Sequence, residues 1–134
     1  MLDRYNVSKL LEVLTCRHIA RNHPASQLRV TLNFVNPGLC MSELQRDAPL
    51  PLRIFSFFFM HLFARTTEVG ARTLVHAGTE AGSETYGKYL TNCGVRACAN
   101  LVEGPEGKGL EDRVWQELSE KLEAIQPGVT KNLG

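Results

Sequence analysis

The sequence predicts an α/β fold with a parallel sheet, on the strength of its first 35 residues. Apolar side chains recur at helical spacing from about Leu2 to Arg21 and predict a helix. Pro24 stops it, because proline donates no backbone hydrogen bond and disfavours helix in the residue before it. Leu28 to Val35 then has β-branched residues with apolar residues at even positions, which predicts a strand. A helix, a short loop and a strand form half of a βαβ unit, and such units build parallel sheets.

The length and composition fit one ordinary globular domain. The chain has 134 residues, of which 43% are hydrophobic and 22% charged, and its formal net charge is +1. A chain of this length holds one modest core, so we expect a single domain over residues 1–134. Nothing in the charge balance suggests disorder or a nucleic-acid partner.

The cysteines indicate neither a metal site nor a disulfide framework. Four residues separate Cys93 from Cys98, which is not zinc-ligand spacing, and no histidine pair accompanies them. The first residues lack a secretion-signal pattern, so we expect reduced thiols and a cytoplasmic location. The longest apolar run, Ile54 to Phe63, is far shorter than the roughly 20 residues of a membrane span.

The predicted strand ends at Asn36-Pro37-Gly38, and an irregular segment from Leu39 to Pro51 follows it. Ligands of open α/β sheets bind beyond the carboxyl ends of the strands, where such loops gather. The segment is either a simple connector or a flap over a site, and its length favours the flap.

The next two segments predict helices. The phenylalanine-rich run from Ile54 to Phe63 predicts a short helix. This helix could be a buried packing element, a wall of an apolar substrate pocket, or a dimer contact. Thr66-Thr67-Glu68 has the hydroxyl cap and acidic first turn of a helix start. That helix should end near Gly78 or Gly82.

The last third of the chain predicts a strand, a loop and a helix. Tyr86 to Leu90 is a short strand candidate, and the glycines within Ala97 to Gly109 predict a flexible loop. This Gly-rich segment follows no predicted strand, so we do not expect it to bind phosphate. A final helix should run from about Leu110 to Ile125 and end before Pro127.

Tyr5 and Lys9 are the candidate chemical pair. On the first predicted helix they stand at i and i+4, so a phenol and an ammonium share one face. A phenol beside a cation can serve as an acid/base group. The spacing alone is weak, since Tyr-x-x-x-Lys arises often by chance, and without further support a plain exposed pair is the default interpretation.

The downstream sequence supplies that support. A Tyr5-x-x-x-Lys9 helix, followed by a strand ending in Pro37-Gly38 and by Ser42 four residues later, resembles the short-chain dehydrogenase/reductase family. Further segments look like its fungal, retinol-dehydrogenase-like members, and the resemblance covers nearly the whole chain. These segments are Asn36 to Cys40, Ala64 to Ala77, Gly87 to Leu90, Arg113 to Trp115 and Ile125 to Gly128.

The resemblance implies a Rossmann-type doubly wound parallel sheet and hydride exchange with NADP or NAD on a secondary alcohol or ketone. Tyr5 would move the hydroxyl proton, while Lys9 would stabilise the phenolate and hydrogen-bond the nicotinamide ribose. Pro37 and Gly38 would bring backbone close to the nicotinamide, and Ser42 would contact its carboxamide or the cofactor diphosphate. The loop and the aromatic run would form a lid suited to a lipophilic substrate, as in secondary-metabolite biosynthesis.

The same resemblance implies that this chain is the C-terminal portion of such a domain, incomplete without its cofactor-binding half. Members carry a Gly-rich phosphate turn, an Asn-Asn-Ala-Gly strand end and a catalytic serine before the tyrosine, whereas only four residues precede Tyr5 here. The residue that selects NAD or NADP would also lie in the cofactor-binding half. The first strand would expose an edge, so we expect self-association, docking to a complementing partner chain, or marginal stability.

Three functions therefore remain open. In the first, the chain is part of an active oxidoreductase that is completed by a longer gene product or by a partner chain. In the second, it is an inactive remnant that acts as an interaction or regulatory piece. The third is a cofactor-independent isomerase or cyclase that uses Tyr5 as a proton shuttle.

Overall fold

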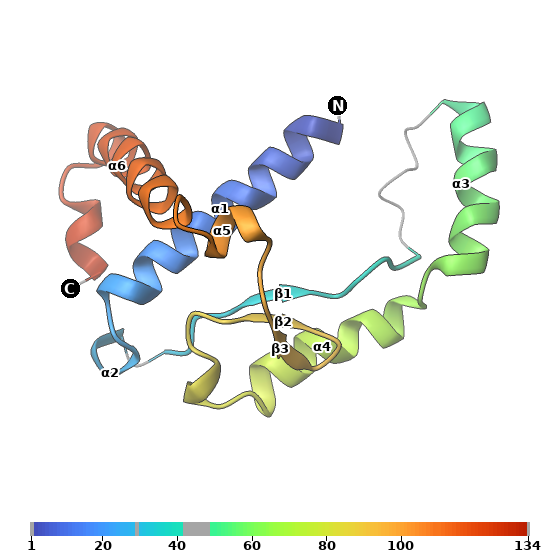
Figure 1. Ribbon diagram of the computed structural model, residues 1–134, viewed down its shortest axis with the longest axis horizontal. Coiled ribbons are helices and arrows are strands. Elements are labelled where there is room, and N and C mark those ends of the chain that lie inside the picture. The colour runs from blue at the N-terminus through green and yellow to red at the C-terminus, as the bar shows by residue number, and fades with distance from the viewer. Residues whose placement is uncertain (1, 29, 42–48, 134) are drawn as a thin grey trace. The chain divides into compact units, whose positions relative to one another are not determined.

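The structure is a computed structural model that describes residues 2–28, 30–41 and 49–133 (Figure 1). The chain divides into two compact units. The first comprises Met1–Phe34, Gly82–Tyr89 and Arg96–Gly134, and the second comprises Val35–Ala81 and Leu90–Val95.

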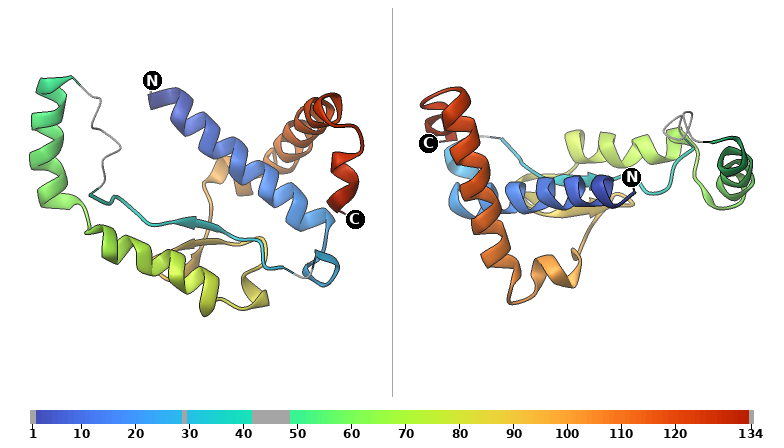
Figure 2. Two further views of the ribbon diagram at one scale, coloured as in Figure 1. Left: turned by 180° about the vertical axis from the view of Figure 1, so that it is seen from behind. Right: turned by 90° about the horizontal axis from the view of Figure 1, so that it is seen from above.

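The first unit is built on helices α1 (Leu2–Asn22) and α6 (Gly107–Ile125), which pack against each other. The contact involves the C-terminal half of α1, as the views in Figure 2 show. Leu14 is buried on α1, and the ring of His18 stacks on that of Trp115 with 5.1 Å between their centroids. Two short elements also pack on α6. They are α5 (Asn100–Glu103) and the 3-10 helix η3 (Val129–Leu133).

The strand predicted at Leu28–Val35 is wrong over most of its length. A short helix, α2 (Ala25–Leu28), occupies its start, and the strand β1 covers only Phe34–Asn36. The φ angle that the proline ring imposes is compatible with the start of a helix, and the Pro24 carbonyl accepts from the amide of Gln27 at 2.9 Å. Bonds to the neighbouring segment begin only at Leu32, whose carbonyl accepts from Gly87 at 2.7 Å.

The sheet contains β1, β2 (Tyr89–Thr91) and β3 (Gly94–Arg96) in that order and is mixed. Asn92 and Cys93 join β2 to β3 with φ angles of 54° and 55°, the left-handed geometry of a two-residue hairpin turn. This pair is therefore antiparallel, and β1 and β2 are the parallel pair. The prediction of a parallel sheet is right for β1–β2 and wrong for β2–β3, and β1 is an edge strand among the described residues.

The second unit contains α3 (Leu50–Phe63) and α4 (Thr67–Thr79), and both predicted helices are confirmed. Helix α3 begins earlier than expected because Pro51 stands in its first turn, where proline is tolerated. Thr66 caps α4 as predicted, its side chain accepting from the amide of Val69 at 3.3 Å. The predicted flap thus ends at Pro49, and its residues 42–48 lie outside the described part of the chain.

The loop predicted at Ala97–Gly109 is wrong, since α5 lies within it and α6 begins at Gly107. A Cβ on Gly107 would stand 1.9 Å from the carbonyl oxygen of Val102. This glycine is therefore required for the close approach of α5 and α6 rather than for flexibility. The predicted end of the last helix at Ile125 is confirmed.

Candidate active site

Tyr5 and Lys9 lie on the N-terminal half of α1, where every residue from Arg4 to Lys9 is exposed. As the spacing predicted, the two side chains share one face, and the Lys9 Nζ lies 5.8 Å from the centroid of the Tyr5 ring. Tyr5 is 49% exposed, so a ligand can reach its hydroxyl from solvent. At this distance the charge of Lys9 can act on the Tyr5 phenol.

Glu12 is the direct partner of Lys9. Its two carboxylate oxygens accept from Lys9 Nζ at 2.9 and 3.0 Å. The hydrogen bond and the negative charge of Glu12 raise the pKa of Lys9 above 10.5, with a smaller contribution from Tyr5. Lys9 is therefore a firmly protonated cation, held one turn along the helix on the side away from Tyr5.

Pro37 and Gly38 form the turn that follows β1 in the second unit. Gly38 has φ +83°, a conformation that favours glycine, and its amide donates to the side chain of Asn36 at 2.8 Å. The guanidinium of Arg65 lies against Gly38 and donates to Asn92. Leu39 accepts from the Arg65 amide at 2.9 Å, which ties the turn to the residues just before α4.

Helix α4 also packs closely on this turn. A Cβ on Gly70 would stand 2.3 Å from the Cys40 sulfur and 3.4 Å from the Cβ of Pro37. Cys40 in turn lies with its sulfur 3.4 Å from the Pro37 carbonyl oxygen. The first turn of α4 thus fixes the backbone at Pro37.

The structure brings together some of the predicted site residues. Tyr5 and Lys9 are neighbours in the first unit, and Pro37 and Gly38 are neighbours in the second. Ser42 lies outside the described residues. Among the described residues, no group of three histidine, cysteine, aspartate or glutamate side chains could hold a metal ion, and no helix is long and apolar enough to cross a membrane.

Sequence reasoning missed an ionic cluster between α1 and α6. Glu111 is only 2% exposed and accepts from Arg17 Nε at 2.8 Å and from Arg21, which also donates to Asp112. His18 Nδ1 lies 3.0 Å from the same Asp112 oxygen. The i and i+4 spacing of Arg17 and Arg21 signals a shared face, but their partners lie 90 or more positions away in the sequence, so no local pattern reveals them.

A cavity of about 380 Å³ opens beside this cluster, and none of the predicted site residues lines it. Its charged walls include Lys88 and Lys108 as well as Glu103. Cys98 lies near Arg17, and the pKa of its thiol is raised chiefly by burial, so the thiol stays protonated at neutral pH.

Comparison with known proteins identifies relatives along nearly the whole chain. The short chain dehydrogenase/reductase dmxR8 of Cryptosporiopsis sp. is 53% identical over 131 residues, which is 97% of this chain and 39% of that protein. The short-chain dehydrogenase/reductase phmF of Phaeosphaeria nodorum is 37% identical over 119 residues, covering 89% of this chain and 34% of the relative. The short-chain dehydrogenase anuD of Penicillium roqueforti is 36% identical over 135 residues, covering 96% and 35%.

No protein-family model matches the chain, and no solved structure does. The chain spans little more than a third of the length of the curated relatives it matches, which agrees with the expectation of a C-terminal portion. Its relatives imply a Rossmann-like α/β fold, and the parallel β1–β2 pair is compatible with one. By sequence, this chain belongs to the fungal short-chain dehydrogenase/reductases.

Proposed function

We propose that this chain carries the proton-transfer part of an NAD(P)-dependent oxidoreductase that acts on a lipophilic secondary alcohol or ketone. The observation that carries the proposal is the shared face of Tyr5 and Lys9 on the exposed half of α1, in a chain homologous to this family. Segments outside this chain would complete the incomplete Rossmann-type domain.

Tyr5 would be the acid/base group of the reaction. In reduction its hydroxyl gives a proton to the carbonyl oxygen, and in oxidation the phenolate takes the proton of the alcohol. A bound NAD(P) supplies or accepts the hydride. Lys9 would stabilise the phenolate by its charge, because an opposite charge within a few ångströms favours the ionised form.

The residues of this chain fit the nicotinamide end of such a cofactor. Lys9 offers three N–H donors for ribose hydroxyls, and Gly38 has no side chain of its own, so a flat ring could approach its backbone where the Arg65 guanidinium now lies. Together with Pro37 and Ser42 they are the proposed cofactor-binding residues.

The Gly-rich segment of this chain does not form a binding site for the pyrophosphate of the cofactor. Gly107 lies in direct contact with the Val102 carbonyl, and Glu106 brings a negative charge to the start of α6. A phosphate needs free amides and no acid there. The pyrophosphate site of the proposed enzyme must therefore lie on another segment.

The Lys9–Glu12 ion pair sets a condition on the mechanism. For Lys9 to reach a cofactor ribose or the Tyr5 oxygen, its ammonium must turn away from Glu12. Exposed ion pairs contribute little, so cofactor contacts can replace this one. The proposed active geometry thus forms only when the cofactor is bound.

A second candidate is an interaction piece without catalysis. The observation that favours it is the edge position of β1, together with three exposed apolar residues on the first half of α1, which are Tyr5, Val7 and Leu11. Edges and apolar faces of this kind bind partner chains.

The four cysteines are free thiols, which supports a reducing compartment such as the cytoplasm.

Titration with NADPH, followed by nicotinamide fluorescence, separates the two candidates. We expect no saturable binding at micromolar concentrations by this chain alone. A chimera in which the N-terminal part of dmxR8 precedes this chain should bind NADPH saturably, and Lys9→Ala should weaken that binding. If the chimera folds and NADPH does not bind to it, the oxidoreductase proposal is wrong and the interaction piece is favoured.

A further inference from the structure

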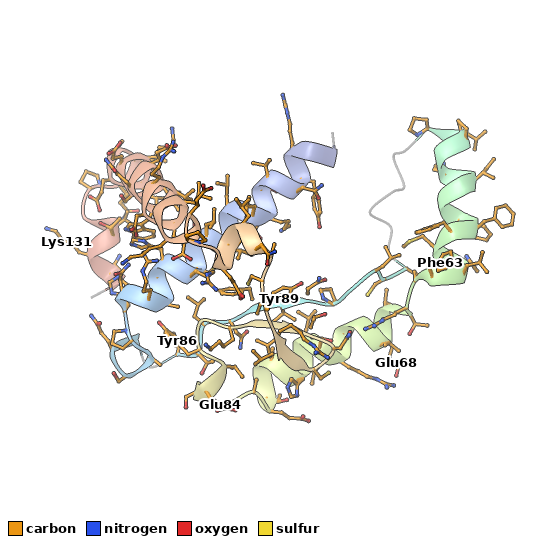
Figure 3. All side chains as sticks on the ribbon, in the orientation of Figure 1. Phe63, Glu68, Glu84, Tyr86, Tyr89 and Lys131 are labelled. Atoms are coloured by element: carbon orange, nitrogen blue, oxygen red, sulfur yellow. The ribbon has the colours of Figure 1, made fainter. Side chains whose placement is uncertain are left out.

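Helix α1 contacts α6 with the face opposite to the one that carries Tyr5 and Lys9. At about 100° per residue, Lys9 lies about 40° from Tyr5 around the helix axis. Arg17 lies about 120° and Arg21 about 160° from Tyr5, and both bind α6. In Figure 3 the side chains of α6 lie against those of the C-terminal half of α1, whereas those of the N-terminal half project free of α6.

One carboxylate on α6 holds both arginines. Glu111 Oε1 accepts from Arg17 Nε at 2.8 Å, and Glu111 Oε2 accepts from Arg21. The Glu111 side chain is buried, whereas each arginine side chain keeps part of its surface in solvent. Both carboxylate oxygens are therefore occupied by donors that stand one turn apart on α1.

This arrangement resists rotation of α1 about its axis. A guanidinium donates only in its own plane, so each hydrogen bond limits direction as well as distance. Turning α1 by one residue position would move both arginines away from Glu111 and leave a buried carboxylate without a partner, which is strongly unfavourable. A buried ion pair of this kind is well suited to fixing how one helix sits on another.

Two further contacts hold the same side of α1. His18 lies about 140° from Tyr5 in the opposite sense around the axis. Its ring stacks on that of Trp115, and its Nδ1 lies 3.0 Å from an Asp112 oxygen that also accepts from Arg21. Helix α6 thus holds α1 on both sides of the line that is diametrically opposite to Tyr5.

Helix α1 can transmit this orientation to its N-terminal half. It is one helix of 21 residues without an interior glycine or proline, the usual causes of a kink. About 18 Å of regular helix separates Tyr5 from Arg17. We propose that Glu111 is a positioning residue, which through Arg17 and Arg21 fixes the rotation of α1 and directs the face of Tyr5 and Lys9 away from α6. The consequence for catalysis rests on the proposed function, whereas the orientation itself does not.

Residual dipolar couplings of the backbone amides in the full chain measure this rotation. In the unchanged chain, one alignment frame should fit the amides of α1 and α6. Glu111→Gln keeps the size of the side chain but offers one acceptor oxygen to two arginines, so the amides of α1 should no longer fit the frame set by α6. Glu117→Gln, at an exposed position on α6, is the control and should keep a single frame.

A second variant decides the question if Glu111→Gln does not fold. Arg17→Lys combined with Arg21→Lys keeps both charges beside Glu111 and removes the planar guanidinium groups. This variant should stay folded while α1 loses its fixed rotation. The proposal is overturned if Glu111→Gln folds and keeps α1 in its original rotation, or if the double lysine variant does so.

The consequence for catalysis is measured in the dmxR8 chimera as turnover per bound NADPH, which a smaller amount of folded protein does not change. Glu111→Gln should lower this ratio about tenfold because the acid/base group is misplaced, and Glu117→Gln should leave it unchanged. An unchanged ratio in Glu111→Gln would show that Glu111 does not position Tyr5. If the chimera without further substitutions has no turnover, the proposed function fails instead, and the dipolar couplings still decide whether Glu111 fixes the rotation of α1.

Discussion

Lys9 donates to both carboxylate oxygens of Glu12, at 2.9 and 3.0 Å, while its ammonium lies 5.8 Å from the centre of the Tyr5 ring. The lysine of the proposed catalytic pair therefore has a competing partner within α1. Because Glu12 holds the Lys9 ammonium, the pair would take up the geometry for proton transfer only when a cofactor is bound.

Replacing Glu12 should lower the pKa of Lys9. Glu12→Gln removes the strongest interaction that raises it, so the Lys9 pKa should fall toward its ordinary value of 10.5. NMR titration of the lysine ammonium signals measures the change, and Glu120→Gln on α6 is the control. A Lys9 pKa that stays raised in Glu12→Gln would contradict the ion pair.

The same shift has a defined sign for stability. Because the folded state raises the Lys9 pKa, the ion pair contributes fully below pH 10.5 and is lost as the pH rises through the higher folded value. Glu12→Gln should therefore make the free energy of unfolding depend less on pH in the alkaline range. The change should be small, since both side chains are exposed.

Removing Glu111 should destabilise the first unit. Glu111→Ala leaves Arg17 and Arg21 without their buried acceptor, and we expect a loss of about 2–4 kcal/mol in the free energy of unfolding, less than for fully buried partners. Glu117→Ala, at an exposed position on the same helix, is the matched control and should cost less than about 0.5 kcal/mol. Urea unfolding measures both, and equal losses would mean that the cluster does not stabilise the fold.

Glu123 should titrate below its ordinary value. Its pKa is lowered first by the Thr130 hydroxyl, 2.5 Å away, and then by the amides of Gly128 and Thr130. This contribution to stability is present above pH 4.5 and is lost as the pH falls through the lower folded pKa. Thr130→Val should raise the Glu123 pKa, as measured by carboxylate carbon NMR, whereas Thr79→Val on α4 should not change it.

Two glycines of α4 should respond to alanine in opposite directions. Gly70→Ala places a methyl group 2.3 Å from the Cys40 sulfur and should cost about 1–3 kcal/mol. Gly78→Ala meets nothing within 4 Å and should stabilise the helix by about 0.5–1 kcal/mol. The double variant Cys40→Ala, Gly70→Ala should recover much of the loss, which unfolding experiments can measure. A tolerated Gly70→Ala would show that α4 does not pack on the Pro37 turn.

The sequence predicted those features that local chemistry determines. The Thr66 cap, the end of α6 before Pro127 and the shared face of Tyr5 and Lys9 each follow from residues within one helical turn. The resemblance to the family was also carried by local motifs, and the relatives confirm it.

The features it did not predict depend on distant neighbours. Strand β1 is short because pairing begins only where Leu32 meets Gly87. The glycines around the start of α6 predict a flexible loop, but Gly107 packs so closely on the Val102 carbonyl that a side chain would not fit there. Likewise, the Arg17–Glu111 pair joins residues 94 positions apart.

The most direct test of the proposed function is the effect of Tyr5→Phe on turnover by the dmxR8 chimera. NADPH oxidation is followed with a panel of lipophilic ketones, and NADPH binding is measured on the same samples. Since only the phenolic hydroxyl is lost, Tyr5→Phe should reduce turnover at least about a hundredfold while NADPH binding changes little. If the Tyr5→Phe chimera keeps most of its turnover, Tyr5 is not the proton-transfer residue and the proposed function is wrong.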